Sequence, residues 1–474
     1  MMDIQRSEGE FAEFATQMRD EGQPEGLIAS FRAQYARYRA GESGKIPWDE
    51  ISEIGQSDVI DYGDLAHGDP AHADPAQGDP GRARELLAKL VVIKLNGGLG
   101  TTMKLHRAKS LISVREGRSF LRVIADHLEA LRRMHQVEVP LLLMNSFRTR
   151  EDSLRELSGF SQGALPLDFL QHKVPRIDAN TQRPLQHHHG EERWAPPGHG
   201  DIYLALSLSG LLERLIERGY RWAFVSNADN LGATVDPRIL QHLAANNVDF
   251  AMEVTPKTAA DRKGGTLVRR GGQLTLLERA QVSAEHIAAF EDIGRFSVFN
   301  TNSLWWNLPA LAAKVDAGAL QLPLIVNPKS VDGTEVAQLE TAMGAAVGAF
   351  SSAIGVRVPR QRFAPVKATC DLLAVRSDAY TLDDEGGLRL SEARDVTWGP
   401  PLIELDERFY RGVEEFELRF PHPVSLLGCR RLRVQGDVHF GRDVIVRGEV
   451  TVRNTSAKAL HISSGTMLAD DWTV

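Results

Sequence analysis

The sequence predicts an α/β protein with a mostly parallel sheet, followed by a C-terminal parallel β-helix. From residue 90 to about residue 370, short apolar runs typical of buried strands alternate with segments whose apolar residues recur every three or four positions. This alternation favours a sheet with helices on both faces. Near the C-terminus two apolar ladders recur every six residues, the period of a parallel β-helix. We therefore expect N-terminal helices in residues 1–85, an α/β domain in 86–400 and the β-helix in 401–474.

The N-terminal segment is expected to form helices that pack on the main domain. Two apolar stripes with helical spacing occur in residues 8–40. They consist of Phe11, Phe14, Ala15 and Met18, and of Leu27, Ile28, Phe31, Tyr35 and Tyr38. Residues 66–82 then repeat Gly/Ala-Asp-Pro every five positions. This polar, proline-rich repeat has too little apolar surface to fold, so we expect a flexible insertion.

A glycine-rich turn follows the first predicted strand, residues 90–93. Three of the four residues 97–100 are glycine, and Lys109 precedes a helical pattern that starts after Ser119, a suitable N-cap residue. Glycines allow backbone N–H groups to approach a phosphate or a flat base closely, because no Cβ intervenes. Lys109 would add a positive charge. The spacing matches neither a P-loop nor the dinucleotide fingerprint, and a tight turn without a ligand is the alternative interpretation.

Polar residues also follow the predicted strand at residues 222–225. Asn227 and Asp229 come directly after it, at the edge where open parallel sheets bind ligands. A carboxylate at the end of a strand suits Mg²⁺, which takes few protein ligands and otherwise binds phosphate oxygens and water. Capping of an Asn/Asp turn is the alternative role for Asp229.

A second glycine-containing segment precedes a helix predicted over residues 203–218. Gly198, His199 and Gly200 lie just before this helix. The N-terminus of a helix could receive a phosphate or sugar hydroxyls. An N-cap formed by Asp201 would explain the same residues without a ligand.

Other polar residues carry weaker indications. Asn300 and Asn302 would face the same way in an extended strand, and these amides, like Glu278, could bond sugar hydroxyls. Lys367 lies near a predicted strand, where an ordinary surface lysine is the alternative. The histidine triplet 187–189 is interpreted as a solvated loop, because consecutive side chains rarely converge on one metal.

The C-terminal ladders predict a small separate region. They consist of Leu432, Val438, Val444 and Val450, and of Val434, Phe440, Val446 and Val452. Glycines at positions 436, 441 and 448 punctuate them. We expect this region to serve interdomain or subunit contacts, including self-association, rather than chemistry.

Composition limits the partners of the chain. A formal net charge of −8 argues against nucleic acid or an anionic membrane as the main partner. No apolar run reaches the length of a membrane span, and no signal-peptide core is present, so we expect a cytoplasmic location. The two cysteines, Cys370 and Cys429, provide neither a disulfide framework nor a Cys-based zinc site.

Ten sequence blocks resemble, in the same order, those of the eukaryotic-type UTP–glucose-1-phosphate uridylyltransferase (UDP-glucose pyrophosphorylase) family. The blocks read KLNGGLGTTM, LLLMNSF, FLQHKVPRI, PPGHGDIY, FVSNADNLGATVD, MEVTPKTAADRKGGTL, FNTNSLWW, IVNPKS, QLETAMGAA and PVKATCDLL. The resemblance covers roughly residues 85–460. It implies a glycosyltransferase-A-like (Rossmann-like) catalytic nucleotidyltransferase domain and a C-terminal β-helix. The implied reaction converts UTP and glucose 1-phosphate to UDP-glucose and pyrophosphate.

The resemblance also implies roles for individual residues. The nucleotide would be bound by Leu95, Asn96, Gly97, Gly98, Gln171 and Gly198. The sugar phosphate would be bound by His199, Asn227, Glu278, Asn300 and Asn302. Asp229 would hold Mg²⁺, and Lys109 and Lys367 would be catalytic.

The implied reaction is an in-line attack of the sugar phosphate oxygen on the α-phosphorus of UTP. A phosphate monoester is mostly dianionic at neutral pH, so the nucleophile needs no general base. Positioning of two polyanions and neutralisation of their charge must then supply the acceleration. We expect substitution of Lys109 or Asp229 to lower turnover by orders of magnitude.

The glycine-rich loop departs from the family pattern at two places. Lys104 stands at a family glycine, and Arg107-Ala108 stands at a family Gly-Pro, so we expect a stiffer loop at 104 and a freer one at 108.

Two alternative functions remain open. One alternative is a uridylyltransferase for galactose 1-phosphate or N-acetylglucosamine 1-phosphate. The other is a non-catalytic nucleotide-sugar binding protein assembled through the β-helix.

Overall fold

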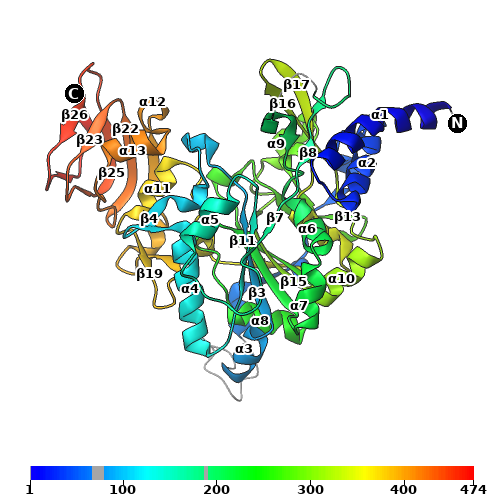
Figure 1. Cartoon of the computed structure of the whole chain (residues 1–474). Coiled ribbons are helices and arrows are strands. Elements are labelled where there is room, and N and C mark those ends of the chain that lie inside the picture. Colours follow the sequence, from blue (N-terminus) through cyan, green and yellow to red (C-terminus); the bar gives the residue numbers. More distant parts are fainter. Residues whose placement is uncertain (1, 67–79, 186–189, 474) are drawn as a thin grey trace.

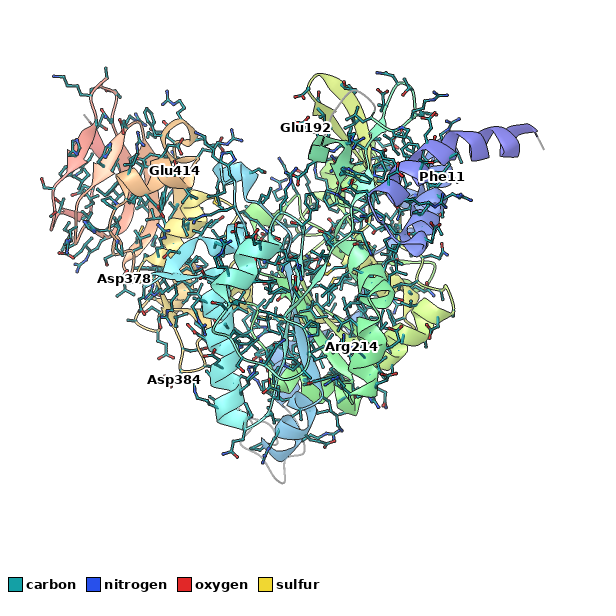
Figure 2. All side chains as sticks on the ribbon, viewed as in Figure 1. Phe11, Glu192, Arg214, Asp378, Asp384 and Glu414 are labelled. Atoms are coloured by element: carbon teal, nitrogen blue, oxygen red, sulfur yellow. The ribbon has the colours of Figure 1, made fainter. Side chains whose placement is uncertain are left out.

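The computed structural model describes residues 2–66, 80–185 and 190–473. The histidine triplet 187–189 and most of the predicted insertion 66–82 lie outside the described residues. Figure 1 shows N-terminal helices on one side, a central sheet between layers of helices, and a group of short strands on the other side. In Figure 2, Phe11 lies in the N-terminal helices and Glu414 at the opposite side of the molecule.

The central sheet has eight strands within the described residues. In spatial order they are β2 (Val59–Asp61), β18 (Ala353–Arg357), β12 (Phe250–Pro256), β15 (Val298–Asn307), β11 (Trp222–Asn227), β3 (Leu90–Asn96), β6 (Leu141–Asn145) and β7 (Asp168–Leu170). All neighbouring pairs are parallel except the two that involve β15. The prediction of a mostly parallel sheet is therefore confirmed.

Helices cover both faces of this sheet. Alternate residues of β3 enter different cores: Leu90 and Val92 face one, and Val91 and Ile93 face the other. This is why the strand reads as one continuous apolar run. The first face is covered by α3 (Pro80–Leu87), α4 (Phe120–His135) and α8 (Pro237–Ala245), and the second by α6 (Ile202–Leu208), α7 (Leu211–Glu217) and α10 (Leu308–Asp316). Ser119 caps α4 as predicted, because its Oγ accepts from the N–H of Arg122 at 3.1 Å.

The single helix predicted over residues 203–218 is wrong. The segment forms α6 and α7, which are separated at Ser209 and Gly210. Gly210 has a φ of +67°, a left-handed conformation that ends α6 and that glycine adopts without steric cost. The apolar period continues across the break, so the sequence pattern does not reveal it.

The N-terminal helices pack on the main body as predicted. Helices α1 (Met2–Asp20) and α2 (Glu25–Arg39) bury Phe11, Phe14 and Phe31 against Trp194 and Leu324. The segment before residue 85 also contributes short strands: β1 (Ile51–Ser52) pairs with β13, and β2 joins the central sheet. Strands of two or three residues are too short to show an alternating pattern.

The remaining elements before the C-terminal strands are short. The helices are α5 (Arg150–Glu156), α9 (Ile287–Phe290), α11 (Thr369–Arg376), α12 (Glu407–Tyr410) and α13 (Val413–Arg419). The strands are β4 (Ser113–Arg115), β5 (Arg118–Ser119), β8 (Val174–Pro175), β9 (Ile177–Asp178), β10 (Trp194–Ala195), β13 (Thr266–Arg270), β14 (Gln273–Leu277), β16 (Ile325–Val331), β17 (Thr334–Glu340), β19 (Tyr380–Leu382) and β20 (Leu388–Leu390). None of the helices in the described parts of the chain has the length and apolarity needed to span a bilayer.

The C-terminal strands pair only in parallel within the described residues. They are β21 (Leu402–Leu405), β22 (Cys429–Gln435), β23 (Val438–Phe440), β24 (Ile445–Val446), β25 (Gly448–Arg453), β26 (Leu460–Ile462), β27 (Met467–Leu468) and β28 (Trp472–Thr473). We call residues 402–473 the C-terminal strand stack. Leu432 pairs with Val450 and Val434 with Val452, so the partner lies three six-residue periods further on. All eight predicted ladder residues are buried, with 2% exposure or less.

Candidate active site

A cavity of about 670 Å³ lies at the carboxyl ends of β3, β6 and β11. The sequence-predicted residues that line it are Leu95, Asn96, Gly97, Gly98, Lys109, Gln171, Gly198, His199, Asn227, Asp229, Asn302 and Lys367. Glu278 and Asn300 are not among its lining residues. The structure therefore brings most of the predicted site together from segments far apart in the sequence.

Two lysines and one aspartate form the charged centre of this cavity. The Nζ atoms of Lys109 and Lys367 lie 2.6 Å and 2.8 Å from Asp229 Oδ2. Burial by itself would raise the pKa of Asp229, but Lys367 and Lys109 together hold that pKa below its ordinary value. Burial lowers the pKa of Lys109, and Asp229 offsets part of this shift. The centre therefore carries two cations on one carboxylate.

Backbone hydrogen bonds hold these three residues in place. The N–H of Lys109 donates to the carbonyl of Gly98, so the glycine-rich loop folds back on itself. The N–H of Val366, next to Lys367, donates to the carbonyl of Asp229. The charged centre is thus assembled from three segments that contact one another directly.

Asp229 keeps one oxygen free for a further ligand. Its Oδ1 atom is buried and has no hydrogen-bond partner among the described residues. A buried acceptor without a partner costs free energy unless a ligand occupies it. No group of three His, Cys, Asp or Glu side chains in the described chain could enclose a metal. The donor set therefore fits an ion such as Mg²⁺ that binds one carboxylate and substrate oxygens.

The glycine-rich loop and Gln171 form another part of the cavity wall. Gln171 donates through Nε2 to the carbonyl of Gly198 at 2.9 Å. A Cβ on Gly97 would lie 2.9 Å from Gln171 Oε1, and one on Gly198 would lie 2.3 Å from the carbonyl oxygen of Thr341. Gly198 therefore requires glycine, since it meets backbone atoms at a φ of +79°, whereas a side chain at Gly97 would displace the amide of Gln171. The side-chain amide of Asn96 is instead used internally, because it donates to Asn145 and Ser153.

His199 is held as a neutral imidazole with a defined tautomer. Burial lowers its pKa to about 4, and Lys367 contributes to the shift. Nδ1 accepts from the N–H of Met343 at 3.0 Å, so the ring proton resides on Nε2. His199 can therefore offer one N–H donor to a ligand in the cavity.

A bulge separates the two asparagines that the sequence grouped together. Glu253 and Val254 of β12 pair with Ser303 and Asn300 of β15, so the two intervening residues are unpaired. Asn302 lies in this bulge with a φ of +61° and donates to Asn227 Oδ1 at 3.0 Å. The alternation expected of an extended strand therefore does not apply here.

Glu278 and Asn300 lie together beside the cavity. The N–H of Asn300 donates to the carbonyl of Gly265, and a Cβ on Gly265 would lie 2.7 Å from Glu278 Oε1. Asn300 Oδ1 accepts from the N–H of Asn302, which connects this group to the cavity. Burial raises the pKa of Glu278, and Lys257 opposes the shift.

The three loop residues 104, 107 and 108 differ in their surroundings. Lys104 has a φ of +55°, in the left-handed region that glycine adopts without steric cost. Its Nζ lies 2.5 Å from Glu415 Oε1, so it connects the loop to α13. Ala108 is buried and Arg107 is exposed.

Sequence reasoning missed several residues of the cavity wall. Phe147, Arg148, Arg176 and Trp194 also line it, although the quoted blocks FLQHKVPRI and LLLMNSF contain two of them. His172 lines the cavity as well, and its Nδ1 bonds Asp201 Oδ1 at 2.9 Å. The N-cap expected of Asp201 is wrong, because its side chain makes no cap hydrogen bond and holds His172 instead. These residues come together from segments that are distant in the sequence, so no local sequence pattern predicts their contacts.

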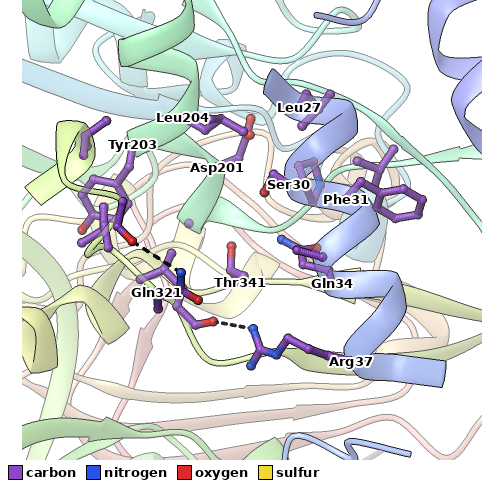
Figure 3. A pocket seen from close by; sticks show the side chains of 18 residues that line it. Leu27, Ser30, Phe31, Gln34, Arg37, Asp201, Tyr203, Leu204, Gln321 and Thr341 are labelled. Carbon is purple, nitrogen blue, oxygen red and sulfur yellow. Dashed lines mark hydrogen bonds between the residues drawn. The ribbon is translucent and has the colours of Figure 1, made fainter. Parts of the chain in front are cut away.

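A second cavity of about 320 Å³ is lined by Gly200, Asp201 and residues of α2 and α6. Figure 3 shows its wall from α2, with Phe31 and Gln34, and the wall from α6, with Tyr203. Arg37 closes one end by donating to the carbonyl of Leu322 at 3.2 Å (Figure 3). The predicted charged centre is absent from this cavity, so the larger cavity is the candidate active site.

The fold and the site together define an α/β protein that binds a phosphorylated small molecule at the ends of parallel strands. The family model for UTP–glucose-1-phosphate uridylyltransferase matches residues 28–447. The chain belongs to this family. It is 46% identical over 437 residues to the Solanum tuberosum enzyme of that name, which covers 92% of this chain and 90% of the relative.

Two further proteins are similar to this chain over most of its length, at lower sequence identity. The Saccharomyces cerevisiae UTP–glucose-1-phosphate uridylyltransferase is 40% identical over 454 residues, covering 94% of this chain and 88% of the relative. A mutant UDP-glucose pyrophosphorylase from Leishmania major in complex with UDP-glucose is 38% identical, with a TM-score of 0.85. That alignment covers 98% of this chain and 99% of the solved chain.

Proposed function

We propose that this chain converts UTP and glucose 1-phosphate to UDP-glucose and pyrophosphate. The observation that carries the proposal is the pair of lysines on Asp229 in a cavity that the glycine-rich loop and Gln171 also line. Membership of the family, and relatives named for this activity over nearly the whole chain, support the same reaction.

The reaction is a single displacement at phosphorus. An oxygen of the glucose 1-phosphate forms a bond to the α-phosphorus of UTP, and the bond from that phosphorus to the bridging oxygen of pyrophosphate breaks. The electron pair leaves with pyrophosphate, and no proton moves at the nucleophile. The chain must therefore position two anions and stabilise their charge.

Lys109 and Lys367 supply that stabilisation. Both ammonium groups already converge on one carboxylate oxygen, so they are held close together before substrate binds. Lys109 has an exposed side-chain fraction of 12%, where a charge interacts more strongly than in bulk water. We assign Lys109 to the triphosphate and Lys367 to the phosphates of both substrates.

Asp229 would hold Mg²⁺ through its free oxygen. The unpartnered Oδ1 atom supports this assignment, and the remaining ligands would come from phosphate oxygens and water. The ion, when bound, supplies positive charge to the phosphate oxygens. Asp229 itself orients Lys109 and Lys367 through Oδ2.

The nucleobase and the sugar are assigned to different residues of the cavity. Leu95, the backbone of Asn96, and the glycines at 97 and 98 would approach the nucleotide closely, with Gln171 and Gly198 reading the edge of uracil. His199 Nε2–H and the amides of Asn227 and Asn302 would contact the hexose phosphate. Glu278 and Asn300, which lie beside the cavity, are assigned to the sugar hydroxyls.

The C-terminal strand stack is proposed to be a parallel β-helix that lies outside the chemistry. Its wholly parallel pairing and its buried six-residue ladders support this assignment. We propose the corresponding division into N-terminal helices, catalytic domain and β-helix, with self-association through the last of these.

Pyrophosphate release from UTP tests the proposed function. We expect turnover with glucose 1-phosphate to exceed that with galactose 1-phosphate or N-acetylglucosamine 1-phosphate, and EDTA to abolish it. Preference for another sugar would reassign the hexose contacts and leave the mechanism unchanged. Binding of UTP without turnover of any sugar would instead favour a non-catalytic nucleotide-sugar binding protein.

A further inference from the structure

Lys94 lies in β3, three residues before the first glycine of the glycine-rich loop. Its side chain is buried, with 4% exposure. Its ammonium group donates to Ser226 Oγ at 2.6 Å and to the carbonyl of Ala233 at 2.8 Å. Lysines are seldom fully buried unless their charge is paired. In the described chain these two bonds of Lys94 go to a hydroxyl and a carbonyl rather than to a carboxylate, so an ion pair does not explain its position.

This one side chain joins both ends of the loop that carries Asp229. Lys94 lies opposite Ser226 in the parallel pair of β3 and β11. The bond to Ser226 therefore connects the two strands where their functional loops begin. The bond to Ala233 reaches the same loop four residues beyond Asp229. Asp229 thus lies in a segment whose start and end are fixed by the same ammonium group.

Two further buried side chains hold the adjoining backbone groups of this loop. Arg362 donates to the carbonyl of Thr234 at 2.8 Å, and His127 Nε2 accepts from the N–H of Val235. Glu253, the carboxylate that acts electrostatically on Lys94, is committed elsewhere, because its oxygens accept from Arg362 and Trp305. Three consecutive residues, 233 to 235, are therefore held by buried side chains from three different elements.

We propose that Lys94 is a positioning residue of the transfer reaction, fixing the loop so that Asp229 presents Oδ1 to the metal and Oδ2 to the two lysines. This inference rests on the proposed function, since it gives Lys94 a part in that reaction. Lys94 does not line the candidate active site. It acts through the position of Asp229, in the way that outer residues orient a metal ligand.

The hydrogen bonds of Lys94 do not require its charge. Burial lowers the pKa of Lys94 to about 7, with Glu253 raising and Arg362 lowering it further. A neutral amine retains two N–H groups, and Lys94 has two acceptors, Ser226 Oγ and the carbonyl of Ala233. The loop is therefore held in the same way on either side of neutral pH, and the proposed role is geometric.

Lys94→Met tests the proposal, because it removes both bonds and retains a long unbranched side chain. In the presence of UTP, we expect Mn²⁺ binding followed by electron paramagnetic resonance to weaken about 10- to 100-fold. We expect kcat to fall at least about tenfold, and the KM for glucose 1-phosphate to stay within about twofold, because the misplaced group is a metal ligand.

Leu215→Ala is the matched control: Leu215 is buried in α7, in the core on the other face of the sheet. It should lower the melting temperature and leave Mn²⁺ binding unchanged.

Two results would overturn the proposal. The first is a folded Lys94→Met protein whose kcat and Mn²⁺ affinity both stay within about twofold of wild type. If Lys94→Met does not fold, Ser226→Ala decides, since it removes one bond of the two. We expect it to weaken Mn²⁺ binding about threefold, and unchanged binding is the second overturning result. A wild-type chain that is inactive in the same assay would contradict the proposed function instead.

Discussion

The candidate active site and the C-terminal strand stack use charge in opposite ways. Beside the active site, around the loop that carries Asp229, Lys94, Glu253 and Arg362 are buried, with 7% exposure or less. In the strand stack the interior consists of apolar ladders, and charges such as Glu404 lie outside, between Arg431 and Arg433. Both regions are built on parallel strands, yet only one accepts the desolvation cost of buried charge.

This difference in buried charge indicates whether each region contributes mainly to chemistry or to stability. Buried charged groups stabilise a fold weakly, because desolvation offsets their attraction, so their concentration at one set of strand ends points to chemistry. Apolar ladders give stability without chemistry. Substitutions at the active site should therefore change rate more than stability, and substitutions in the stack should do the reverse.

The largest expected effect is that of Asp229→Asn. The variant removes the negative charge that Lys109 and Lys367 share, and it removes the proposed metal ligand. We expect kcat for pyrophosphate release to fall about 10³-fold. The melting temperature should change less than the rate, because the Lys367 side chain is exposed to solvent and only Lys109 is largely buried. A rate within tenfold of wild type would show that the charged centre is not catalytic.

Lys109→Met should have the next largest effect. It removes the more buried of the two cations while keeping the apolar stem of the side chain. We expect kcat to fall about 10²-fold, measured in the same assay. Lys89→Met is a suitable control, since Lys89 is an exposed lysine that pairs with Glu85; equal losses in both variants would contradict the assignment.

Leu432→Ala tests the expectation that substitutions in the C-terminal strand stack change stability rather than rate. Leu432 is fully buried and pairs with Val450 on the next strand of the stack. We expect the free energy of unfolding to fall by about 2–5 kcal/mol, as measured by urea unfolding. The kcat below the unfolding transition should remain at the wild-type value. A large fall in kcat of the folded protein would mean that the stack takes part in the chemistry.

Acid should destabilise the chain through two buried histidines. Burial lowers the pKa of His127 and of His199 to about 4, whereas an unfolded histidine titrates near pH 6.5. Between these values the unfolded state binds more protons, so stability falls as the pH falls from about 6.5 to about 4. Urea unfolding at several pH values measures this slope. His127→Gln should make the slope shallower, and an unchanged slope would exclude His127 as a contributor.

Lys104→Gly should have the smallest effect. Glycine removes the strain of a positive φ, which stabilises the loop, and also removes an exposed ion pair with Glu415, which is worth little. The two contributions oppose each other, so we expect the free energy of unfolding to change by less than about 1 kcal/mol. A larger loss would show that the contact between the loop and α13 matters more than an exposed pair.

Most of the fold could be predicted because each element carries its own pattern. Strands such as β3 and β6 are short apolar runs, and α4 has both its apolar stripe and its cap residue in the local sequence. The break at Gly210 was missed, because the apolar period runs through it.

Gly97, Asn227 and Asp229 could be predicted because they lie at or just after the end of a strand. The roles of Gln171, His199 and Lys367 were predicted from the family resemblance instead. The bulge that turns Asn302 toward the cavity depends on how β15 pairs with β12, and the role of Asp201 depends on His172. Such contacts join segments that are distant in sequence, so no local spacing reports them.

The adjacency of β3 and β11 has a consequence for the order of folding. The partners Lys94 and Ser226 are separated by 132 positions in the chain. Closing so long a loop costs entropy before the contact stabilises anything, and chains rich in such contacts fold slowly. Neither the segment before the glycine-rich loop nor the segment around Asp229 can assemble a partial site alone. Catalytic activity should therefore return only in the last phase of refolding, after helical structure has recovered.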